Sequence, residues 1–293
     1  MHNTCSFCGL ENLVSTKIVR INSWKGVRTY WYCKKCKAFT LLPRLTELEM
    51  NDLYSNYYNN SIDLESANTL EKKFTELEEY LNTNIDIETV LDYGCGVDGY
   101  LPSLSGKMHF RVDGFEVSAI TLDILRQRQK EVNFFDTESF EKSNSAYDLI
   151  VLSDVLEHLA EPKDLLLLLK NRLSAGGKIW IQQPLENNAT LFTLLLKGWA
   201  FLSRSKTSKM PPFHVSLASR KALFALAKRS GFVIHSYTVT ETMWPAKSNI
   251  DFMDFKQSLL TLTKYFDYTL SLLFKNYGTR ICCILVKKVE KEH

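Results

Sequence analysis

A glycine-rich segment in the first third of the chain constrains the fold more than any other feature. In Thr89–Leu101, with the sequence TVLDYGCGVDGYL, an apolar run typical of a β-strand ends in Asp92 and then turns through Gly94, Gly96 and Gly99. Glycines at this spacing let the backbone approach a ligand closely, and the helix expected to follow presents an electropositive N-terminus. The segment therefore predicts an α/β fold with a ligand site at this turn.

Asp92 bears on the kind of ligand that the turn binds. The glycine spacing also satisfies the fingerprint of a dinucleotide-binding turn, in which a pyrophosphate lies on the helix N-terminus. A carboxylate two residues before the first glycine would repel a pyrophosphate, but it attracts a ligand that carries an ammonium and a sulfonium group. The loop therefore favours S-adenosylmethionine over a dinucleotide.

Three later segments belong with the glycine-rich turn. They are Phe110–Glu116 (FRVDGFE), Tyr147–Leu159 (YDLIVLSDVLEHL) and Leu173–Ile181 (LSAGGKIWI). Together and in this order, the four segments resemble the motifs of class I S-adenosylmethionine-dependent methyltransferases, over roughly residues 85–290. The resemblance implies a Rossmann-like α/β fold with a seven-stranded, mostly parallel sheet. One departure is Asp98, which stands where that family usually has the third glycine.

The same resemblance implies a cofactor site at the carboxyl ends of the strands. The residues it implies are Asp92, Tyr93, Gly94 and Gly96 for the methionine end, Glu116 for the ribose hydroxyls, Asp136 for the adenine amino group, and Ser153 beside the reacting methyl group.

Methyl transfer to a hydroxyl also requires that a proton be removed. His158 follows Asp154 by one helical turn, so the two side chains are expected on one face, and His214 lies in a basic loop further on. We predict His158, His214 and Asp154 as catalytic candidates, because a group with a pKa near ~6.5 suits proton removal at neutral pH. The alternatives are a structural hydrogen-bonding role for His158 and an ordinary loop position for His214.

Four of the seven cysteines form two Cys-x-x-Cys pairs, Cys5/Cys8 and Cys33/Cys36, on either side of two strand-like stretches. Two such turns can place four thiolates around Zn²⁺ at ~2.3 Å, which predicts a structural zinc ribbon with no open position on the metal. A segment this short depends on metal binding to fold.

The chain divides into segments of different character. We expect a zinc-ribbon-like segment at 1–42, a helical connector at 43–84, and a methyltransferase domain at 85–293 that carries a lid insertion at about 184–218. Residues 190–210 combine an apolar stretch with basic residues, so peripheral membrane contact is an alternative to a lid. No acid lies between Glu186 and Glu241, which favours an anionic small-molecule acceptor.

Composition and missing motifs narrow the function. No apolar run is long enough to span a membrane, and the N-terminus lacks a signal-peptide pattern, so we expect a cytoplasmic, at most membrane-peripheral, protein. The segment Tyr147–Leu159 lacks the motifs of amide-nitrogen and cytosine methylation. The resemblance therefore favours O-methylation (or C-methylation) of a small, sugar-like or phosphorylated acceptor in polysaccharide or secondary-metabolite biosynthesis. An RNA methyltransferase that binds RNA through the basic ribbon, and a non-catalytic cofactor-binding scaffold, are the alternatives.

Overall fold

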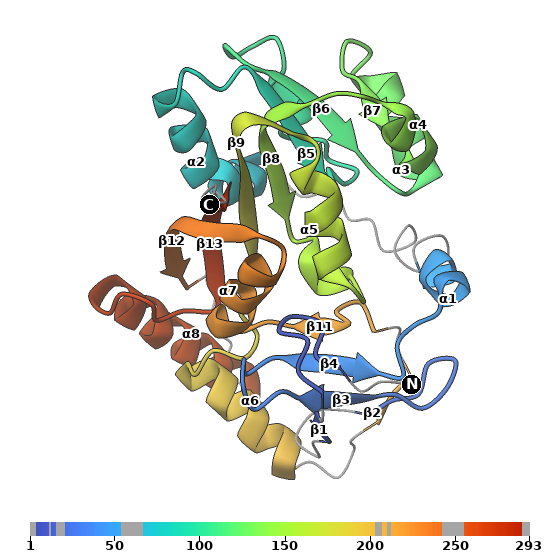
Figure 1. Cartoon of the computed structure of the whole chain (residues 1–293). Helices are drawn as coiled ribbons and strands as arrows, with labels where there is room; N and C mark the ends of the chain where they lie inside the picture. Colours follow the sequence, from blue (N-terminus) through green and yellow to red (C-terminus); the bar gives the residue numbers. More distant parts are fainter. Residues whose placement is uncertain are drawn as a thin grey trace, which may run out of the picture. The chain divides into compact units, whose positions relative to one another are not determined.

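The computed structural model describes residues 4–11, 13–15, 21–53, 67–202, 207–209, 212–241 and 255–288. The chain forms two compact units (Figure 1). Unit 1 contains residues 1–45, 156–166 and 181–285, and unit 2 contains residues 46–155, 167–180 and 286–293. Each unit is described here by itself.

The main sheet has seven strands in the order β12-β13-β9-β8-β5-β6-β7. Their bounds are β5 Thr89–Tyr93, β6 Arg111–Phe115, β7 Phe134–Phe135, β8 Tyr147–Ser153, β9 Leu173–Pro184, β12 Phe232–Thr240 and β13 Arg280–Lys287. The sheet is mixed and mostly parallel, with β5 parallel to both β6 and β8 and with β6 parallel to β7. The predicted α/β fold with a seven-stranded sheet is therefore confirmed.

The strands of unit 2 are apolar because both faces of the sheet are buried there. Val90 and Leu91 in β5 and residues 149–152 in β8 have no exposed surface. Helix α3 (Ala119–Arg128) packs Leu122 and Leu125 against Phe134 of β7. Helix α4 (Thr137–Lys142) and the short helix η3 (Pro102–Leu104) complete the segments between strands. This packing fixes the loop that follows β5.

Helix α2 (Ala67–Thr83) belongs to the same unit and shows the predicted helical periodicity. Phe74, Leu77 and Leu81 are all buried, as their spacing along one helix face requires. Phe74 stacks on Tyr100 at a centroid distance of 5.4 Å, and the Tyr100 hydroxyl donates to Glu78 at 2.8 Å. Helix α1 (Glu47–Asp52) begins at a capping box formed by Thr46 and Glu49.

Unit 1 contains a second, smaller sheet with the strand order β1-β3-β4-β11. Its strands are β1 Val14–Ser15, β3 Thr29–Tyr32, β4 Phe39–Leu42 and β11 Ser216–Leu217, and the ladders are antiparallel. A separate two-stranded sheet joins β2 (Ile21–Asn22) to β10 (Thr207–Ser208). The N-terminal segment thus receives β11 and β10 from the region expected as a lid.

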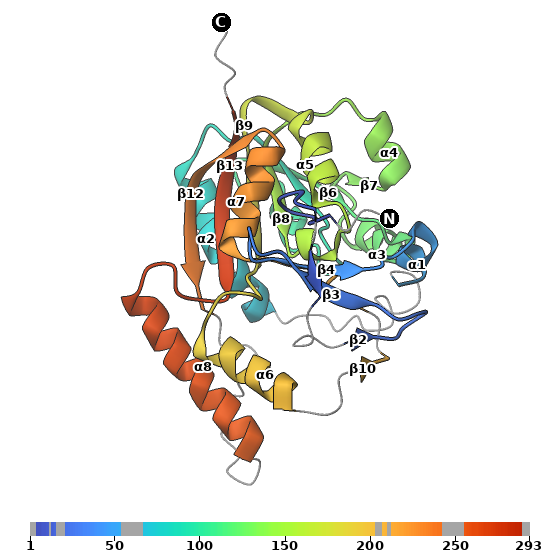
Figure 2. The same cartoon turned by 60° about the horizontal axis from the view of Figure 1, so that its bottom comes forward.

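Helices α6, α7 and α8 belong to unit 1. Helix α7 (Arg220–Arg229) is capped by Ser219, and α6 (Leu191–Leu202) lies beside α8 (Phe255–Leu273) (Figure 2). The Asp267 carboxylate of α8 accepts from the backbone N–H groups of Leu191 and Phe192, at 3.0 and 2.8 Å, and so caps the start of α6. Helix α5 (Pro162–Lys170) and the short helix η4 (Leu156–His158) precede β9.

Several elements differ from the sequence-based expectation. From the sequence we expect a turn at 173–176 and a strand at 131–135. In the structure residues 173–176 lie inside β9, only Phe134–Phe135 form β7, and strand β4 and helix α4 have no counterpart among the expected elements. Such short elements carry too few residues to show a hydrophobic period. The segment boundaries at 42 and 84 and the lid at 184–218 remain predictions, and residues 203–206, 210 and 211 of that lid lie outside the described residues.

Candidate functional site

The glycine loop after β5 adopts the backbone that its sequence requires. Gly94, Gly96 and Gly99 all have positive φ, at +83°, +62° and +52°. The space beside Gly96 is open within 4 Å of where a side chain would begin, which leaves backbone accessible to a ligand. The loop is tied to β6, because the N–H groups of Gly94 and Cys95 both donate to the carbonyl of Phe115, at 2.8 and 3.1 Å. These features match a loop that holds a ligand by its backbone.

Glu116 follows β6 and lies next to this loop. Its carboxylate accepts from the N–H of Gly96 at 3.1 Å and from that of Ser118 at 3.0 Å. The side chain is 7% exposed, and burial raises the pKa of Glu116 above its usual value, although the two backbone donors oppose that shift. A buried carboxylate with lone pairs remaining can accept hydrogen bonds from a pair of hydroxyl groups.

Tyr93 and Asp92 complete the end of β5. Tyr93 stacks on Phe115 of the neighbouring strand at a centroid distance of 4.0 Å, and burial together with the charge of Glu116 raises the pKa of Tyr93 to about 12. The tyrosine therefore stays neutral and serves as packing at physiological pH. Asp92 is 3% exposed and lies opposite Gly114 in the parallel register.

Ser153 and Asp154 end the adjacent strand, β8. The buried hydroxyl of Ser153 makes no hydrogen bond with any residue that the structure describes. Asp154 has a φ of +56°, a left-handed conformation that costs a non-glycine residue roughly 1–2 kcal/mol. Backbone strain of this kind concentrates at functional sites.

Asp136 has a structural role that the sequence did not reveal. It is the N-cap of α4, and its side chain accepts from the backbone N–H of Ser139 at 2.8 Å and from the Ser139 hydroxyl at 2.6 Å. These bonds lower the pKa of Asp136. The predicted adenine contact therefore stays a prediction for a residue already engaged as a helix cap.

In unit 1, the structure brings together the two histidines that the sequence offered as separate candidates. The rings of His158 and His214 meet edge to face at a centroid distance of 4.9 Å. Nδ1 of His158 lies 2.7 Å from the carbonyl oxygen of Phe213, and Nδ1 of His214 lies 2.6 Å from a Glu186 carboxylate oxygen. Both partners are acceptors, so Nδ1 carries the hydrogen and Nε2 carries the lone pair in each neutral ring.

Two hydrogen bonds connect the segments that carry the two histidines. The N–H of Val215 donates to the carbonyl of Glu157 at 2.9 Å, and the Ser216 hydroxyl donates to the carbonyl of Leu159 at 3.1 Å. The side chain of Glu157 is 1% exposed, and it joins His158 and His214 in one group whose ligand atoms all lie within 4.8 Å of one another. We call Glu157, His158 and His214 the histidine cluster.

The four N-terminal cysteines also meet, and we call Cys5, Cys8, Cys33 and Cys36 the cysteine cluster. Their sulfur atoms lie within 4.8 Å of one another, with 3.4 Å between Cys5 and Cys36 and 3.5 Å between Cys8 and Cys33. Four sulfurs at ~2.3 Å from a tetrahedral zinc are about 3.8 Å apart, so the cluster is consistent with a zinc site. The thiol of Cys36 lowers the pKa of Cys5 to about 5 through a hydrogen bond.

The two Cys-x-x-Cys turns have the same backbone hydrogen bonds. The N–H of Cys5 donates to Leu10 and that of Gly9 to Cys5, and the N–H of Cys33 donates to Ala38 and that of Lys37 to Cys33, all at 2.9 Å. Gly9 and Lys37, which follow the second cysteine of each turn, are both left-handed, with φ of +69° and +64°. The two turns are therefore equivalent halves of one site.

Helix α7 contacts both cysteine turns. Its N-cap Ser219 donates its hydroxyl to the carbonyl of Cys36 at 2.6 Å. At its other end, Nη1 of Arg229 donates to the carbonyls of Phe7 at 2.9 Å and Ser6 at 3.3 Å. One helix from the second half of the chain thus fixes the backbone of both turns.

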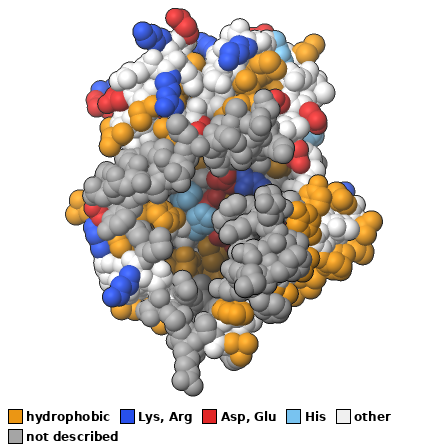
Figure 3. Space-filling view, turned by 180° about the vertical axis from the view of Figure 1, so that it is seen from behind, with side chains coloured by type: hydrophobic (Ala, Val, Ile, Leu, Met, Phe, Trp, Pro, Cys, Tyr) orange, Lys and Arg blue, Asp and Glu red, His pale blue; other side chains and the backbone are white. Residues whose placement is uncertain are grey.

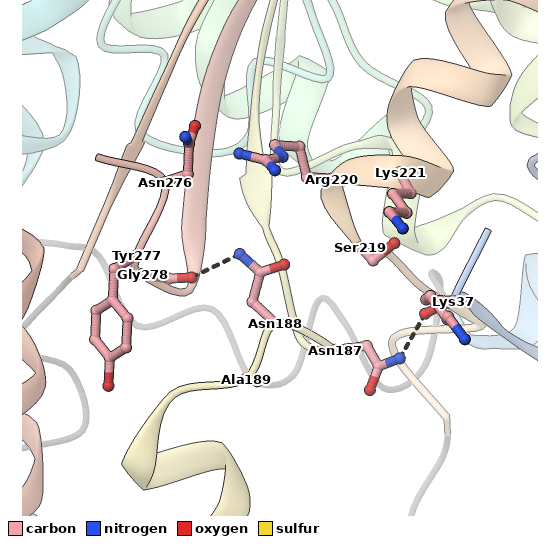
Figure 4. A pocket seen from close by; sticks show the side chains of 10 residues that line it. All are labelled: Lys37, Asn187, Asn188, Ala189, Ser219, Arg220, Lys221, Asn276, Tyr277 and Gly278. Carbon is pink, nitrogen blue, oxygen red and sulfur yellow. Dashed lines mark hydrogen bonds between the residues drawn. The ribbon is translucent and has the colours of Figure 1, made fainter. Parts of the chain in front are cut away.

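Unit 1 also contains a cavity of about 310 Å³ (Figure 4). Its lining includes the cations Lys37, Arg220 and Lys221, and the amides of Asn187 and Asn188, which donate to the carbonyls of Lys37 and Gly278. Among the residues that the structure describes, no carboxylate lines the cavity, so its chemistry suits a polar or anionic molecule. None of the predicted site residues lines this cavity.

A family model described as a methyltransferase domain matches residues 65–237, more than half of the chain. The chain belongs to this methyltransferase family. It is a class I enzyme that uses S-adenosylmethionine as methyl donor, and the motifs in residues 89–181 lie inside the matched region. Among the described residues, no helix of this methyltransferase is long and apolar enough to cross a membrane.

Curated relatives of this methyltransferase include the ubiquinone biosynthesis O-methyltransferase of Coxiella burnetii, 28% identical over 119 residues, which are 38% of this chain and 50% of that protein. The mitochondrial ubiquinone biosynthesis O-methyltransferase of Candida albicans is 28% identical over 120 residues, covering 38% of this chain and 36% of that protein. The chain thus spans half or less of the length of the curated relatives it matches.

A solved structure supports the fold. The magnesium protoporphyrin IX methyltransferase of Synechocystis PCC 6803, with bound SAH, superposes with a TM-score of 0.53 at 14% identity, over 83% of this methyltransferase and all of that chain. The residues at the carboxyl ends of β5, β6 and β8 fit such a cofactor, because they combine open backbone at Gly96, the buried Glu116 carboxylate and the buried Ser153 hydroxyl.

Three residues of the histidine region were missed from the sequence. Glu157 precedes His158 in the segment Tyr147–Leu159, so the sequence shows the residue and only its role was missed. Glu186 and Tyr30 contact His214 from distant parts of the chain, and the Tyr30 hydroxyl donates to its backbone carbonyl. Burial, with the charge of Glu186, raises the pKa of Tyr30, so this phenol remains a neutral donor. No local pattern joins residues so far apart.

Proposed function

We propose that this methyltransferase transfers a methyl group to a hydroxyl oxygen of a small, oxygen-rich acceptor. The observation that carries the proposal is the histidine cluster, because a hydroxyl acceptor needs a site that takes up its proton. Similarity to two O-methyltransferases, 28% identical over parts of their length, supports oxygen as the methylated atom. The acid-free stretch between Glu186 and Glu241, with the cationic lining of the cavity, favours an anionic acceptor such as a phosphorylated sugar.

The proposed roles follow from the chemistry of the transfer. Asp92, Gly94 and Gly96 hold the methionine part of the donor, with Tyr93 packed beneath, and Glu116 accepts from the ribose hydroxyls. The donor supplies an activated methyl group on sulfonium, so the protein aligns the acceptor oxygen and excludes water.

The acceptor proton leaves through the histidine cluster. His158 follows Asp154 by four residues, a backbone distance of at most about 14 Å. We propose His158 as the principal proton acceptor, since it lies on a short helix, with His214 supporting it and Asp154 helping to position the acceptor. The remaining roles, for Asp136 at the adenine and Ser153 near the methyl group, are part of the same proposal.

Donor binding tests this proposal. Calorimetry with S-adenosylmethionine is expected to show one site per chain, and Glu116→Ala is expected to weaken it about 10- to 150-fold, as loss of charge-assisted hydrogen bonds costs about 1.5–3 kcal/mol. Glu138→Ala, an exposed carboxylate on α4, is the matched control and leaves affinity unchanged. Tighter binding of NADH than of the donor would contradict the proposal.

The raised pKa of Glu116 gives a second test with a defined sign. The charged carboxylate binds the ribose hydroxyls, so affinity is full at neutral pH and falls as the pH drops through the pKa of Glu116. Because burial raises that pKa above the ordinary 4.5, the loss begins at a higher pH than an exposed glutamate would require. Calorimetry across the acidic range, compared with Glu116→Gln, measures it, and an affinity that is equally pH-dependent in the variant would assign the effect elsewhere.

We also propose that the cysteine cluster holds a structural zinc ion.

A further part of the proposal is that unit 1 contacts a membrane surface. Helices α6 and α8 expose large apolar side chains. Among them are Leu194, Trp199, Phe266 and Leu272, whose exposed fractions are 54%, 56%, 54% and 71%. Figure 3 shows hydrophobic side chains gathered over α8, at the lower right. These exposed apolar side chains, together with the cations Lys197 and Lys209, favour contact with an anionic membrane surface.

Vesicle sedimentation tests the membrane contact. Vesicles with anionic lipid are expected to bind the protein, and a Trp199→Ser and Phe266→Ser double variant is expected to lose most of that binding. A Val27→Ser variant, which changes an exposed apolar residue elsewhere, is the control. If the double variant binds vesicles as well as Val27→Ser does, the exposed side chains of α6 and α8 are not the membrane contact.

A further inference from the structure

We propose that the cavity of unit 1 is a binding site for the phosphate group of a small sugar phosphate. Its lining combines the cations Lys37, Arg220 and Lys221 with asparagine and serine side chains. Among the described residues that line the cavity none is acidic, so no carboxylate in the lining balances the positive charge. A phosphate monoester carries about −1.5 to −2 charges at pH 7 and has three strong acceptor oxygens, so it matches this lining in charge and in hydrogen bonding.

Arg220 gives the strongest indication that an anion binds in the cavity. Its Nη1 is buried and makes no hydrogen bond with any residue that the structure describes. The guanidinium group lies over the ring of Tyr237, with 5.7 Å between Cζ and the ring centroid, a contact that uses the face of the group and none of its N–H donors. A guanidinium group stays protonated, and its donors fit the oxygens of a phosphate. A bound phosphate would therefore give the buried Nη1 the acceptor that it needs.

The start of α7 adds to the positive potential of the cavity. Arg220 and Lys221 are the first two residues of this helix, directly after the N-cap Ser219. The N–H groups at these positions have no partner inside the helix, and the helix dipole makes this end electropositive. An anion in the cavity is therefore attracted by the charged side chains and also by the backbone of α7.

Hydrogen bonds between distant parts of the chain fix the polar lining of the cavity (Figure 4). Nδ2 of Asn187 donates to the carbonyl of Lys37, and Oδ1 of the same amide accepts from Nζ of Lys197 at 2.6 Å. Nδ2 of Asn188 donates to the carbonyl of Gly278 at 2.9 Å. These bonds hold the cavity in shape without a ligand, which lowers the entropy cost of binding one.

Asn276 indicates that the ligand also carries hydroxyl groups. It lies between α8 and β13, and its Oδ1 is buried and accepts from no residue that the structure describes. In Figure 4 the guanidinium group of Arg220 extends toward this amide. A hydroxyl group can donate to Oδ1 while the phosphate of the same molecule lies at Arg220, which favours a sugar phosphate over a bare anion. The cavity volume of about 310 Å³ is at the lower end of the range of about 300–1,000 Å³ for small-molecule sites, which suits a monosaccharide.

This site deepens the proposed function but does not depend on where the donor binds. All residues that line the cavity belong to unit 1. That the bound molecule is also the methyl acceptor rests on the proposed function, whereas phosphate binding depends only on the lining of the cavity.

Phosphate binding can be measured without methyl transfer. Titration calorimetry of the full chain with inorganic phosphate is expected to show one site per chain. Glucose 6-phosphate is expected to displace the phosphate, and glucose is not. Arg220→Gln is expected to weaken phosphate binding about 10- to 100-fold, because it removes charge-assisted hydrogen bonds. Lys221→Gln removes an exposed charge and is expected to weaken binding about 2- to 5-fold.

Lys228→Gln is the matched control, because it removes the same charge from an exposed position in the last turn of the same helix. Asn276→Asp places a carboxylate in the cavity, so it is expected to abolish phosphate binding and to retain thermal stability, since the new charge lies among cations. No phosphate binding by the wild-type chain, equal weakening by Lys228→Gln and Arg220→Gln, or failure of glucose 6-phosphate to displace phosphate would overturn the proposal. S-adenosylmethionine affinity, measured on the same samples, reports separately on the proposed function.

Discussion

The cysteine cluster and the histidine cluster lie in the same unit of the molecule and differ in how the sequence encodes them. The cysteine cluster consists of two short, equivalent turns, each closed by the same pair of backbone hydrogen bonds. The histidine cluster joins Glu157 and His158 to His214, and Glu186 supports it from a third position. The first is visible as a spacing, while the second exists only after the chain has folded.

This difference has chemical consequences. Four thiolates fill the coordination of a tetrahedral metal, so the cysteine cluster can stabilise structure but has no position for a substrate. The histidine cluster contains two imidazoles, which can accept a proton, so it can take part in a reaction. The predictions below are ordered from the largest expected effect to the smallest.

Cys33→Ser should have the largest effect. Zinc binding contributes about 10–16 kcal/mol to small sites of this kind, and one lost thiolate removes most of it. We expect loss of zinc by elemental analysis and loss of amide protection in the β1-β3-β4-β11 sheet by hydrogen exchange. Cys283→Ala, a buried thiol outside the cluster, should retain both. Metal-free protein with a protected sheet would show that the cysteines do not need a metal.

Replacing either histidine should affect catalysis and leave the fold intact. We expect His158→Ala and His214→Ala to lower turnover about 10²- to 10⁴-fold, with donor affinity nearly unchanged, because in the proposed function both histidines act on the acceptor proton and other residues hold the donor. Single-turnover assays with an acceptor found by screening would measure this, with His235→Ala as control. Near-normal turnover in both variants would mean that neither histidine is the base. The rate would then depend on the alignment of donor and acceptor, or on Asp154 as the base.

Ser219→Ala should have the smallest effect. The hydroxyl caps α7 and also donates to the carbonyl of Cys36, so its removal should cost about 1 kcal/mol for the cap and about 1 kcal/mol for the second bond. Ser118→Ala is the comparison, because that hydroxyl caps α3 in the same way. If thermal unfolding shows the same loss of unfolding free energy in both variants, the hydrogen bond from Ser219 to Cys36 contributes nothing to stability.

The contrast between the clusters also explains what the sequence could predict. The strands, the glycine turn and the cysteine cluster depend on residues close together in the chain, and the α/β fold with its seven-stranded sheet is confirmed. The N-cap role of Asp136 was missed because an aspartate at this position suits both a helix cap and the predicted contact with the adenine. Strand β11 and the contacts of Glu186 and Tyr30 depend on long-range pairing, which leaves no local period or spacing.

Helix α7 has a consequence for the synthesis of the protein. Cys36 and Phe7 precede their partners Ser219 and Arg229 by 183 and 222 residues. At about 5–20 residues per second, the ribosome completes α7 roughly 10–40 s after the cysteine turns have emerged. For that interval the four thiols are exposed to oxidation, competing metals and chaperones without their covering helix. With the proposed zinc ion, the order of the chain therefore makes early metal capture the step that protects a newly made molecule.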